Sequence, residues 1–264
     1  MSVPQQFNFL AQTRYGALIY NRFDTHGGRS IELYGEYAER EIGVLNQTVS
    51  AGMVALDIGA QIGAQTLFLA RKVGPAGRIL AFEPRRLMFQ TLCGNMAINS
   101  ITNVHCWNAA VGDQPGEAVV PPFDHQSPAD MRTIRLATGV EGERVPLVTI
   151  DSLNLPRCDF IRLALPGYEE AALAGGTATI ARLKPVLYIN CEAGAPSEDA
   201  LVRRIDSLGY NMYWHQPELF NPENFAGNSQ NEFGHATSRH LLCVDAAITQ
   251  ELIGFTPVQA QRAA

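Results

Sequence analysis

A glycine-rich turn and the acid that follows it are the residues of this chain best placed to bind a small molecule. The turn reads LDIGAQIG over residues 56–63, where an apolar run gives way to a helical pattern. Gly59 allows the tight turn and Gly63 a close approach of backbone to ligand, beside the free N–H groups of a helix N-terminus. Glu83 ends the next apolar run. An acid there can accept hydrogen bonds from both ribose hydroxyls of an adenosine, so the pattern predicts a nucleoside site.

The turn differs from the one that binds the pyrophosphate of a dinucleotide. That pattern is G-x-G-x-x-G, and the position of its second glycine is Gln61 here. The sequence therefore predicts no dinucleotide site. A purely structural glycine turn followed by an incidental acid is the simpler alternative.

The elements that must position these residues follow from short apolar runs that alternate with helical patterns. Runs typical of buried strands cover 53–58, 78–83, 103–108, 160–165, 185–190, 210–215 and 240–245. Helical patterns cover 62–73, 86–99, 168–182 and 197–209. This alternation predicts an α/β fold with a doubly wound, mostly parallel sheet. The last two strands have no helix between them, so we expect them to pair antiparallel at one edge.

The rest of the chain is expected to surround a single domain. Residues 1–50, with a helix-like stretch over 31–45, are interpreted as an N-terminal cap over the open ends of the strands, and 51–264 as the ligand-binding domain. Residues 112–147 are rich in Pro, Gly and Asp and should form a loop with short strands beside the site. The polar segment 221–233 should close the same mouth as the cap.

Composition favours small-molecule chemistry over nucleic-acid or membrane binding. The net charge is -6, and no run of Lys or Arg suggests an anionic partner. The five cysteines are scattered without a CxxC pair, which argues for a reducing compartment and against a disulfide or zinc framework. No secretory signal is visible, so we expect a cytoplasmic protein. The sequence does not predict the oligomeric state.

Several sequence blocks closely resemble the FkbM family of S-adenosylmethionine (SAM)-dependent methyltransferases. They span about residues 14–245 and read RSIELYGEYAE, LDIGAQIGAQTLFLARKVGPAGRILAFEP, NVHCWNAAVGD, VPLVTIDSL, GYEEAALAGG, RLKPVLYIN, and YWHQPELFNPENFAGNSQNEF followed by LLCVD. The resemblance implies a class I, Rossmann-like fold and O-methylation of a hydroxyl on a small molecule, such as a sugar or natural product. It implies that Asp57 lies at the methionine end of SAM, Glu83 at the ribose and Asn108 near the adenine. The expected cofactor-binding residues are Asp57, Gly59, Ala60, Gln61, Gly63, Glu83, Pro84, Asn108, Ala109 and Ala110.

The chain departs from the family where acceptor-side acids are expected. The family usually reads K-I-D-V-E-G where residues 162–167 read RLALPG, so both acids are absent. Its Glu-Asn-Asp is replaced by NCE at 190–192, and its Asn in G-A-N-I-G by Gln61. Ala164 and Pro166 can neither bind a divalent metal nor take a proton, so we predict that no metal takes part.

Three functions remain open after these departures. The first is methyl transfer with a different base; the second is intramolecular cyclisation of SAM to azetidine-2-carboxylate and methylthioadenosine, with no acceptor at all. The third is a catalytically silent SAM binder. Cyclisation needs a snug, dry site with aromatic faces for the sulfonium. The candidate catalytic residues are Tyr34, Glu36, Tyr168, Asn190 and Glu192. His215, His235 and His240 match no metal-ligand spacing and are expected to be polar loop residues.

Overall fold

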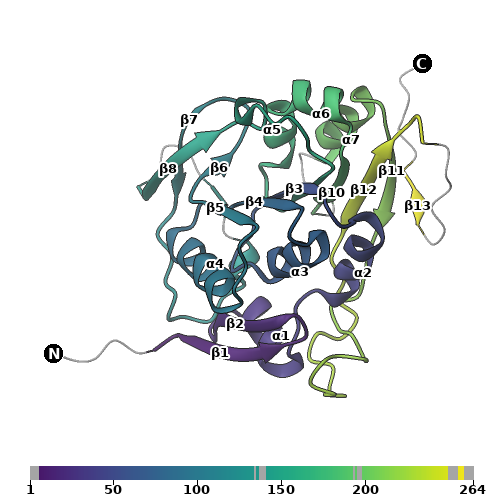
Figure 1. Cartoon of the computed structure of the whole chain (residues 1–264). Helices are drawn as coiled ribbons and strands as arrows, with labels where there is room; N and C mark the ends of the chain where they lie inside the picture. Colours follow the sequence, from purple (N-terminus) through teal and green to yellow (C-terminus); the bar gives the residue numbers. More distant parts are fainter. Residues whose placement is uncertain are drawn as a thin grey trace.

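The computed structural model of the chain describes residues 6–133, 135–136, 141–192, 194, 198–248 and 255–258. An eight-stranded sheet in the order β13-β11-β12-β10-β9-β3-β4-β5 lies at its centre (Figure 1). Strands β10 to β5 in this order are parallel, whereas β12 pairs antiparallel with both β10 and β11. The strands are β3 (Val54–Ile58), β4 (Arg78–Phe82), β5 (Val104–Trp107), β9 (Phe160–Leu163), β10 (Val186–Asn190), β11 (Tyr210–His215), β12 (His240–Asp245) and β13 (Thr256–Pro257). The predicted doubly wound sheet is confirmed, and the short β13 extends its antiparallel edge.

Helices cover both faces of the sheet (Figure 1). Those on one face are α2 (Glu39–Thr48), α3 (Ala64–Val73) and α4 (Arg86–Ile98); those on the other are α5 (Glu169–Ala174), α6 (Thr177–Leu183) and α7 (Glu198–Ser207). Because both faces are covered, the central strands are mostly apolar, and every residue of β3 from Ala55 to Ile58 is buried, Asp57 included. Separate apolar clusters on the two faces make up the core.

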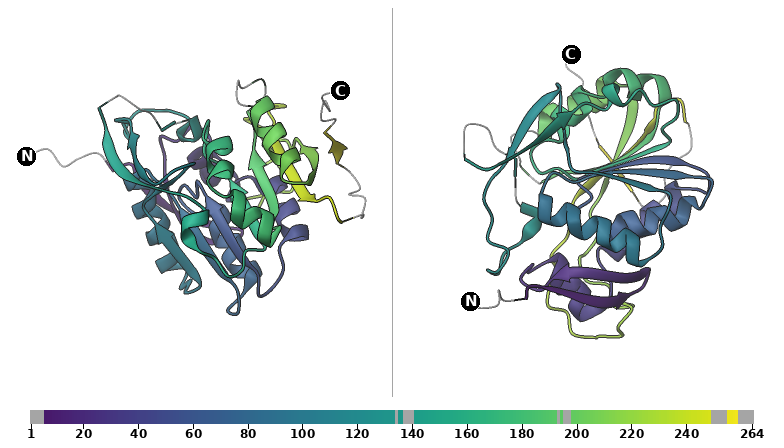
Figure 2. Two further views of the ribbon diagram at one scale, coloured as in Figure 1. Left: turned by 90° about the horizontal axis from the view of Figure 1, so that it is seen from above. Right: turned by 60° about the vertical axis from the view of Figure 1, so that its left-hand side comes forward.

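The N-terminal segment begins with a hairpin that the sequence patterns did not predict. Strands β1 (Asn8–Thr13) and β2 (Gly16–Asn21) pair antiparallel and lie against α4 (Figure 2). Asn95 of α4 accepts a hydrogen bond from Ile19 N over 2.6 Å and donates one to Ile19 O over 3.0 Å. The hairpin is thereby attached to the helical layer.

The helix-like stretch over 31–45 is two helices, so the prediction of one was wrong. Helix α1 (Gly27–Tyr34) ends at Gly35, which has φ 62° and donates its N–H to Ile31 O, and α2 begins after Ala38. Only glycine adopts this left-handed conformation at little cost. The change of direction at Gly35 brings Tyr37 and Glu41 toward the carboxyl ends of the strands, where both line a cavity.

The single helix predicted over 168–182 is likewise interrupted. Helices α5 and α6 are separated by Gly175 and Gly176. A Cβ atom on Gly175 would lie 2.0 Å from Gly112 O, so the close approach of these two backbone segments requires glycine. The helical spacing of apolar residues continues across Gly175 and Gly176, so the sequence pattern did not predict the break between α5 and α6.

Short strands do occur within the segment 112–147, as predicted: β7 (Gly116–Val120) and most of β8 (Glu143–Val148). Together with β6 (Ala110–Val111), just before the segment, they form a separate sheet. The 3-10 helix η1 (Met131–Thr133) lies within the segment and η2 (Asp151–Leu153) follows it. Parts of the predicted segments 1–50, 51–264, 112–147 and 197–209 lie outside the described residues.

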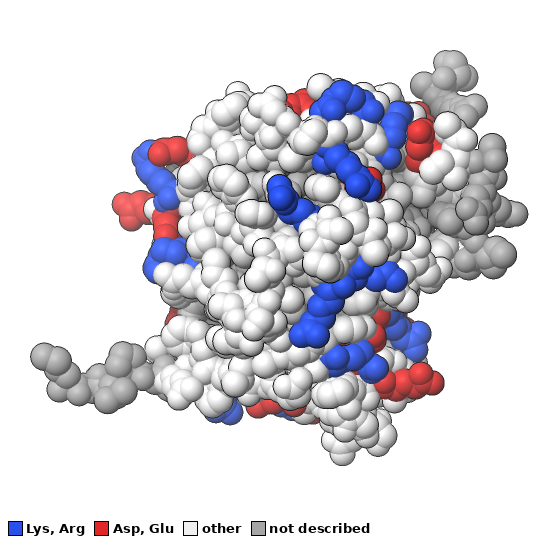
Figure 3. Space-filling model, in the orientation of Figure 1, with Lys and Arg blue, Asp and Glu red and all other residues white. Residues whose placement is uncertain are grey.

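On the face seen in Figure 3, several Lys and Arg side chains gather in the right-hand half with a few Asp and Glu among them, and the surface left of centre is largely uncharged. Within the part of the chain that the structure describes, no helix is long and apolar enough to cross a membrane.

Candidate active site

Three loops meet around the carboxylate of Glu83 at the end of β4. Gln61, from the turn after β3, donates its backbone N–H to Glu83 Oε2 over 2.8 Å. Asn108, which follows β5, donates its side-chain amide to the carbonyl oxygens of Glu83 and Pro84 over 2.9 Å each. Ala109 and Ala110 are buried directly after it. The segments that the sequence assigns to the cofactor therefore lie side by side.

The turn after β3 depends on glycine at two positions. The N–H groups of Gly59 and Ala60 both donate to Phe82 O, over 2.9 and 3.0 Å. Gly59 has φ 81°, and a Cβ atom there would lie 2.1 Å from Ala164 O. Gly63 has φ 86° and precedes α3 directly. Both positions exclude other residues because of backbone conformation as well as space.

Glu83 is already saturated by protein hydrogen-bond donors. Arg85 donates its backbone N–H and Nε to Glu83 Oε1, over 2.9 and 2.6 Å, and its Nη2 to Oε2 over 2.9 Å. With Gln61 N on Oε2 as well, each carboxylate oxygen accepts two bonds. A carboxylate offers about four lone-pair sites, so a ribose would have to displace the Arg85 side chain. Arg85 directly precedes α4, yet its side chain is buried.

A second buried ion pair lies at the end of β3. Asp57 Oδ1 accepts from Arg162 Nη1 over 2.7 Å, and Oδ2 accepts from the Thr66 hydroxyl over 2.6 Å. Burial alone would lower the pKa of Arg162, but Asp57 and Glu41 outweigh it and raise this pKa. Arg162 therefore stays charged beneath the site.

A cavity of about 430 Å³ opens at the carboxyl ends of β9 and β10 and runs from Gln61 in the turn to His240 at the start of β12. This volume is within the range of small-molecule sites. Its lining residues are Tyr37, Glu41, Gln61, Arg132, Thr133, Arg135, Arg162, Ala164, Pro166, Asn190, Cys191, Glu192, Gln216, Thr237, Ser238, Arg239 and His240.

Glu41 and His240 form a buried acid–imidazole pair in the wall of this cavity. Glu41 Oε1 lies 3.0 Å from His240 Nε2, and the carboxylate also accepts from Ser238 Oγ and Gln65 Nε2, over 2.8 Å each. Burial alone would raise the pKa of Glu41, but His240, Arg162 and Ser238 outweigh it and hold this pKa well below its usual range. Glu41 is therefore an anion beside the imidazole.

The histidine ring is held from its other side by packing. His240 stacks on Tyr188 with 4.6 Å between ring centroids, and the Tyr188 hydroxyl lies 2.9 Å from His215 Nδ1. Burial, together with the neighbouring His240, lowers the pKa of His215 to about 4. The interpretation of His215 and His240 as loop residues was wrong, because both lie on strands; His235 is an exposed loop residue as expected.

The predicted catalytic residues are divided among different places. Asn190 and Glu192 line the cavity. Tyr168 lies elsewhere, beside Pro84 and Leu165 in a space of only about 10 Å³. Tyr34 and Glu36 do not line the cavity.

Tyr34 and Glu36 instead attach the tail segment to the N-terminal helices. The Tyr34 hydroxyl donates to Gln230 O over 2.9 Å and accepts from Glu232 N over 3.0 Å. Glu36 accepts from Arg14 Nη2 over 2.7 Å and from Phe225 N over 2.9 Å. The tail and the N-terminal segment are thus in contact, but residues 221–233, which were expected to close the mouth of the site, do not line the cavity.

Tyr34→Phe should therefore affect stability and leave ligand binding unchanged. Loss of two hydrogen bonds in a buried place should lower the free energy of unfolding by about 1–2 kcal/mol, as measured by urea denaturation. Tyr213→Phe is the matched control, because the Tyr213 hydroxyl makes no hydrogen bond within the described residues. A Tyr34→Phe protein with normal stability and weakened SAM binding would return Tyr34 to the active site.

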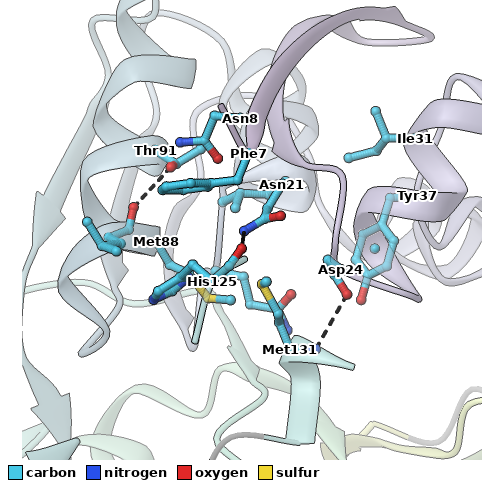
Figure 4. A pocket seen from close by; sticks show the side chains of 14 residues that line it. Phe7, Asn8, Asn21, Asp24, Ile31, Tyr37, Met88, Thr91, His125 and Met131 are labelled. Carbon is cyan, nitrogen blue, oxygen red and sulfur yellow. Dashed lines mark hydrogen bonds between the residues drawn. The ribbon is translucent and has the colours of Figure 1, made fainter. Parts of the chain in front are cut away.

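A smaller cleft of about 30 Å³ adjoins the cavity beneath the N-terminal segment (Figure 4). Tyr37 and Gln61 line both spaces, whereas Phe7, Met88 and His125 are among the residues that line the cleft but not the cavity. Asp24 accepts a hydrogen bond from Met131 N at its lower end. The cleft connects the glycine-rich turn to the hairpin side of the molecule.

One more acid near the cavity has a strongly shifted pKa. Burial raises the pKa of Glu169 to about 7, although the Gly167 N–H donates to its carboxylate over 2.9 Å.

Among the residues that the structure describes, no group of three or more His, Cys, Asp or Glu is arranged to hold a metal ion.

Comparison with known proteins decides the family. The sequence model of the methyltransferase FkbM domain matches residues 57–212, more than half of the chain. The chain belongs to the FkbM methyltransferase family. No curated protein gave a significant match.

Solved structures agree in fold with this FkbM chain. It is similar to the methyltransferase FkbM from Methylobacillus flagellatus KT, with 20% identity and a TM-score of 0.50 over 73% of this chain and 44% of that one. It is also similar to precorrin-6y C5,15-methyltransferase from Geobacter metallireducens GS-15, with 15% identity and a TM-score of 0.50 over 81% and 94% of the two chains. This chain therefore spans less than half of the Methylobacillus protein. These likenesses show the class I SAM-dependent methyltransferase fold.

Proposed function

We propose that this FkbM protein transfers the methyl group of SAM to a hydroxyl of a small molecule bound in the 430 Å³ cavity. The observation that carries the proposal is the Glu41–His240 pair in the wall of that cavity. It supplies a proton acceptor in a protein whose strand ends have lost the family's usual acids.

The cofactor residues fit SAM on one condition. By the family resemblance, the turn at Gly59–Gly63 would hold the methionine end of SAM near Asp57, and Glu83 would hold the ribose, provided that the Arg85 side chain leaves the carboxylate. SAM then supplies an electrophilic methyl group on its sulfonium.

The protein's residues would orient the acceptor and remove its proton. Glu41 next to Nε2 favours the tautomer that carries the proton on that nitrogen, which leaves Nδ1 as the base. The acceptor O–H proton passes to His240 Nδ1 as the O–CH3 bond forms and the S–CH3 bond breaks. The products are a methyl ether and S-adenosylhomocysteine (SAH), and the Glu41 carboxylate stabilises the charged imidazole.

The open cavity also favours an acceptor over cyclisation of SAM. Cyclisation would need aromatic side chains to fill the space beside the sulfonium. Of the candidate residues, Tyr34 and Tyr168 do not line the cavity, whereas Asn190 does, and Tyr37 is the aromatic residue in its lining.

The test is to incubate the protein with SAM, alone and with a panel of hydroxylated compounds, and to separate the nucleoside products. We expect SAH only when an acceptor is present, together with its methyl ether. Methylthioadenosine formed from SAM alone would contradict methyl transfer and support cyclisation. SAM binding without either product would identify a silent binder.

A further inference from the structure

The wall of the cavity contains an excess of guanidinium groups. Four arginines line it, against two glutamates: Arg132, Arg135, Arg162 and Arg239 against Glu41 and Glu192. They come from separate parts of the chain, namely η1 and the residue soon after it, β9, and the start of β12. Each arginine is paired with a carboxylate, namely Asp130, Glu192, Asp57 and Glu198 respectively, so an anionic ligand would bind through the donors that these pairs leave free.

Arg162 has hydrogen-bond donors left over although it is only 6% exposed. Its Nη1 bonds to Asp57 Oδ1 over 2.7 Å and contacts Gly59 O at 3.4 Å. Its Nε and Nη2 make no hydrogen bond to any residue that the structure describes. These two donors are left for a ligand, and hydrogen bonds from a charged donor are stronger than those from a neutral one.

Arg132 and Arg239 are similarly held in place with donors to spare. Asp130 binds Nε and Nη2 of Arg132, the latter over 2.7 Å, and leaves Nη1 without a partner among the described residues. Arg239 bonds to Glu198 through Nη2 over 2.7 Å and lies 3.5 Å over the Trp214 ring. Guanidinium groups fixed in this way lose little freedom when they bind a carboxylate.

Glu41 interacts electrostatically with two of these arginines and is also in contact with the proposed base, His240. Its charge raises the pKa values of both Arg162 and Arg132, against the lowering effect of burial on each, and it contacts His240 directly. A ligand in this part of the cavity therefore meets fixed cations and a proton acceptor together.

We propose that the methyl acceptor is a hydroxy acid, whose carboxylate binds Arg162 and Arg132 while its hydroxyl lies at His240. This inference rests on the proposed methyl transfer and adds the chemical class of the substrate. A planar carboxylate suits the forked donors of arginine and carries the opposite charge, whereas the hydroxyls of a neutral sugar or alcohol form only weaker, uncharged hydrogen bonds with them.

The test compares matched acids and neutral compounds by calorimetry on SAH-loaded protein: D-glucuronate with D-glucose, L-lactate with L-lactamide, and salicylate with salicylamide. SAH binding is measured first, and its absence counts against the proposed function alone; the acid preference can also be measured without SAH. We expect the acid of at least one pair to bind about tenfold more tightly, as charge-assisted hydrogen bonds imply.

Two substitutions and a control assign the preference to the cavity. Arg162→Lys keeps the charge beside Asp57 but loses the forked donors, and Arg132→Gln loses the second guanidinium. Each should reduce acid binding about tenfold without changing the binding of the neutral partner. Arg144→Gln, at an exposed arginine paired with Glu117, should change neither.

Three results would overturn the inference. The first is equal binding within all three pairs, and the second is an acid preference that survives in both variants. The third comes from the cofactor's own carboxylate: if Arg162→Lys and Arg132→Gln weaken SAH binding but not methylthioadenosine binding, these arginines bind the cofactor and not the acceptor.

Discussion

Glu83→Ala should destabilise the folded protein by about 3–5 kcal/mol, because it leaves the Arg85 charge buried without its partner. Glu83 is fully buried and Arg85 is 7% exposed, so little water can replace the lost carboxylate. Gln61 N and Arg85 N lose an acceptor at the same time. Urea denaturation measures the difference.

A double-mutant cycle separates the ion pair from the other contacts of Glu83. In an Arg85→Ala background, the further change Glu83→Ala leaves no unpaired charge behind. It should therefore cost clearly less free energy of unfolding there than it does in the native protein. An equal cost in both backgrounds would show that the pair with Arg85 is not the cause. Glu83→Gln keeps the shape of the side chain and should be less harmful than Glu83→Ala.

The same variants test how the ribose is bound. Arg85→Ala frees two acceptor sites on Glu83 and should tighten SAM binding about tenfold. Glu83→Ala should weaken it by about 1–3 kcal/mol, since the ribose hydroxyls lose their acceptor. Weaker binding by Arg85→Ala would instead place Arg85 among the groups that hold SAM. Unchanged affinity after Glu83→Ala would remove Glu83 from the ribose site.

The central sheet could be predicted from the sequence because its signals are local. Strands buried on both faces are continuous apolar runs, such as VALDI in β3, and helices of regular period lie between them. The breaks at Gly35 and Gly175 could not be predicted, since each depends on a distant segment: Phe225 at one and Gly112 at the other. The N-terminal hairpin depends in the same way on the side chain of Asn95 in α4.

The cofactor side of the site could also be predicted from local sequence signals, but the acceptor side could not. Gly59 and Glu83 lie in one continuous motif. Glu41 and His240 are at opposite ends of the chain and meet only because α2 and β12 both reach the cavity. Tyr34 and Glu36 occur in a polar, motif-like stretch, yet they serve the tail contact. Contacts between residues so far apart in the chain cannot be predicted from their spacing in the sequence.

His240→Asn should have the largest effect on catalysis of any change in the cavity. Loss of a general base typically lowers the rate about 10²–10⁴-fold, so kcat should fall by that factor with the acceptor found in the SAH assay. SAM affinity should remain unchanged, because neither His240 nor Glu41 contacts the residues around Glu83. Glu41→Gln keeps the shape of the side chain but removes the charge, so it should lower kcat less.

A solvent isotope effect distinguishes proton transfer from mere packing on Tyr188. Methyl transfer by the native enzyme should be slower in D2O than in H2O, because the acceptor's proton moves to the imidazole as the O–CH3 bond forms. The residual rate of His240→Asn should lack this slowing. If the variant keeps the native isotope effect at a lower rate, the ring only positions the acceptor. The base would then be Glu169, which lines a small cleft beside the cavity. Burial raises the pKa of its carboxyl to about 7.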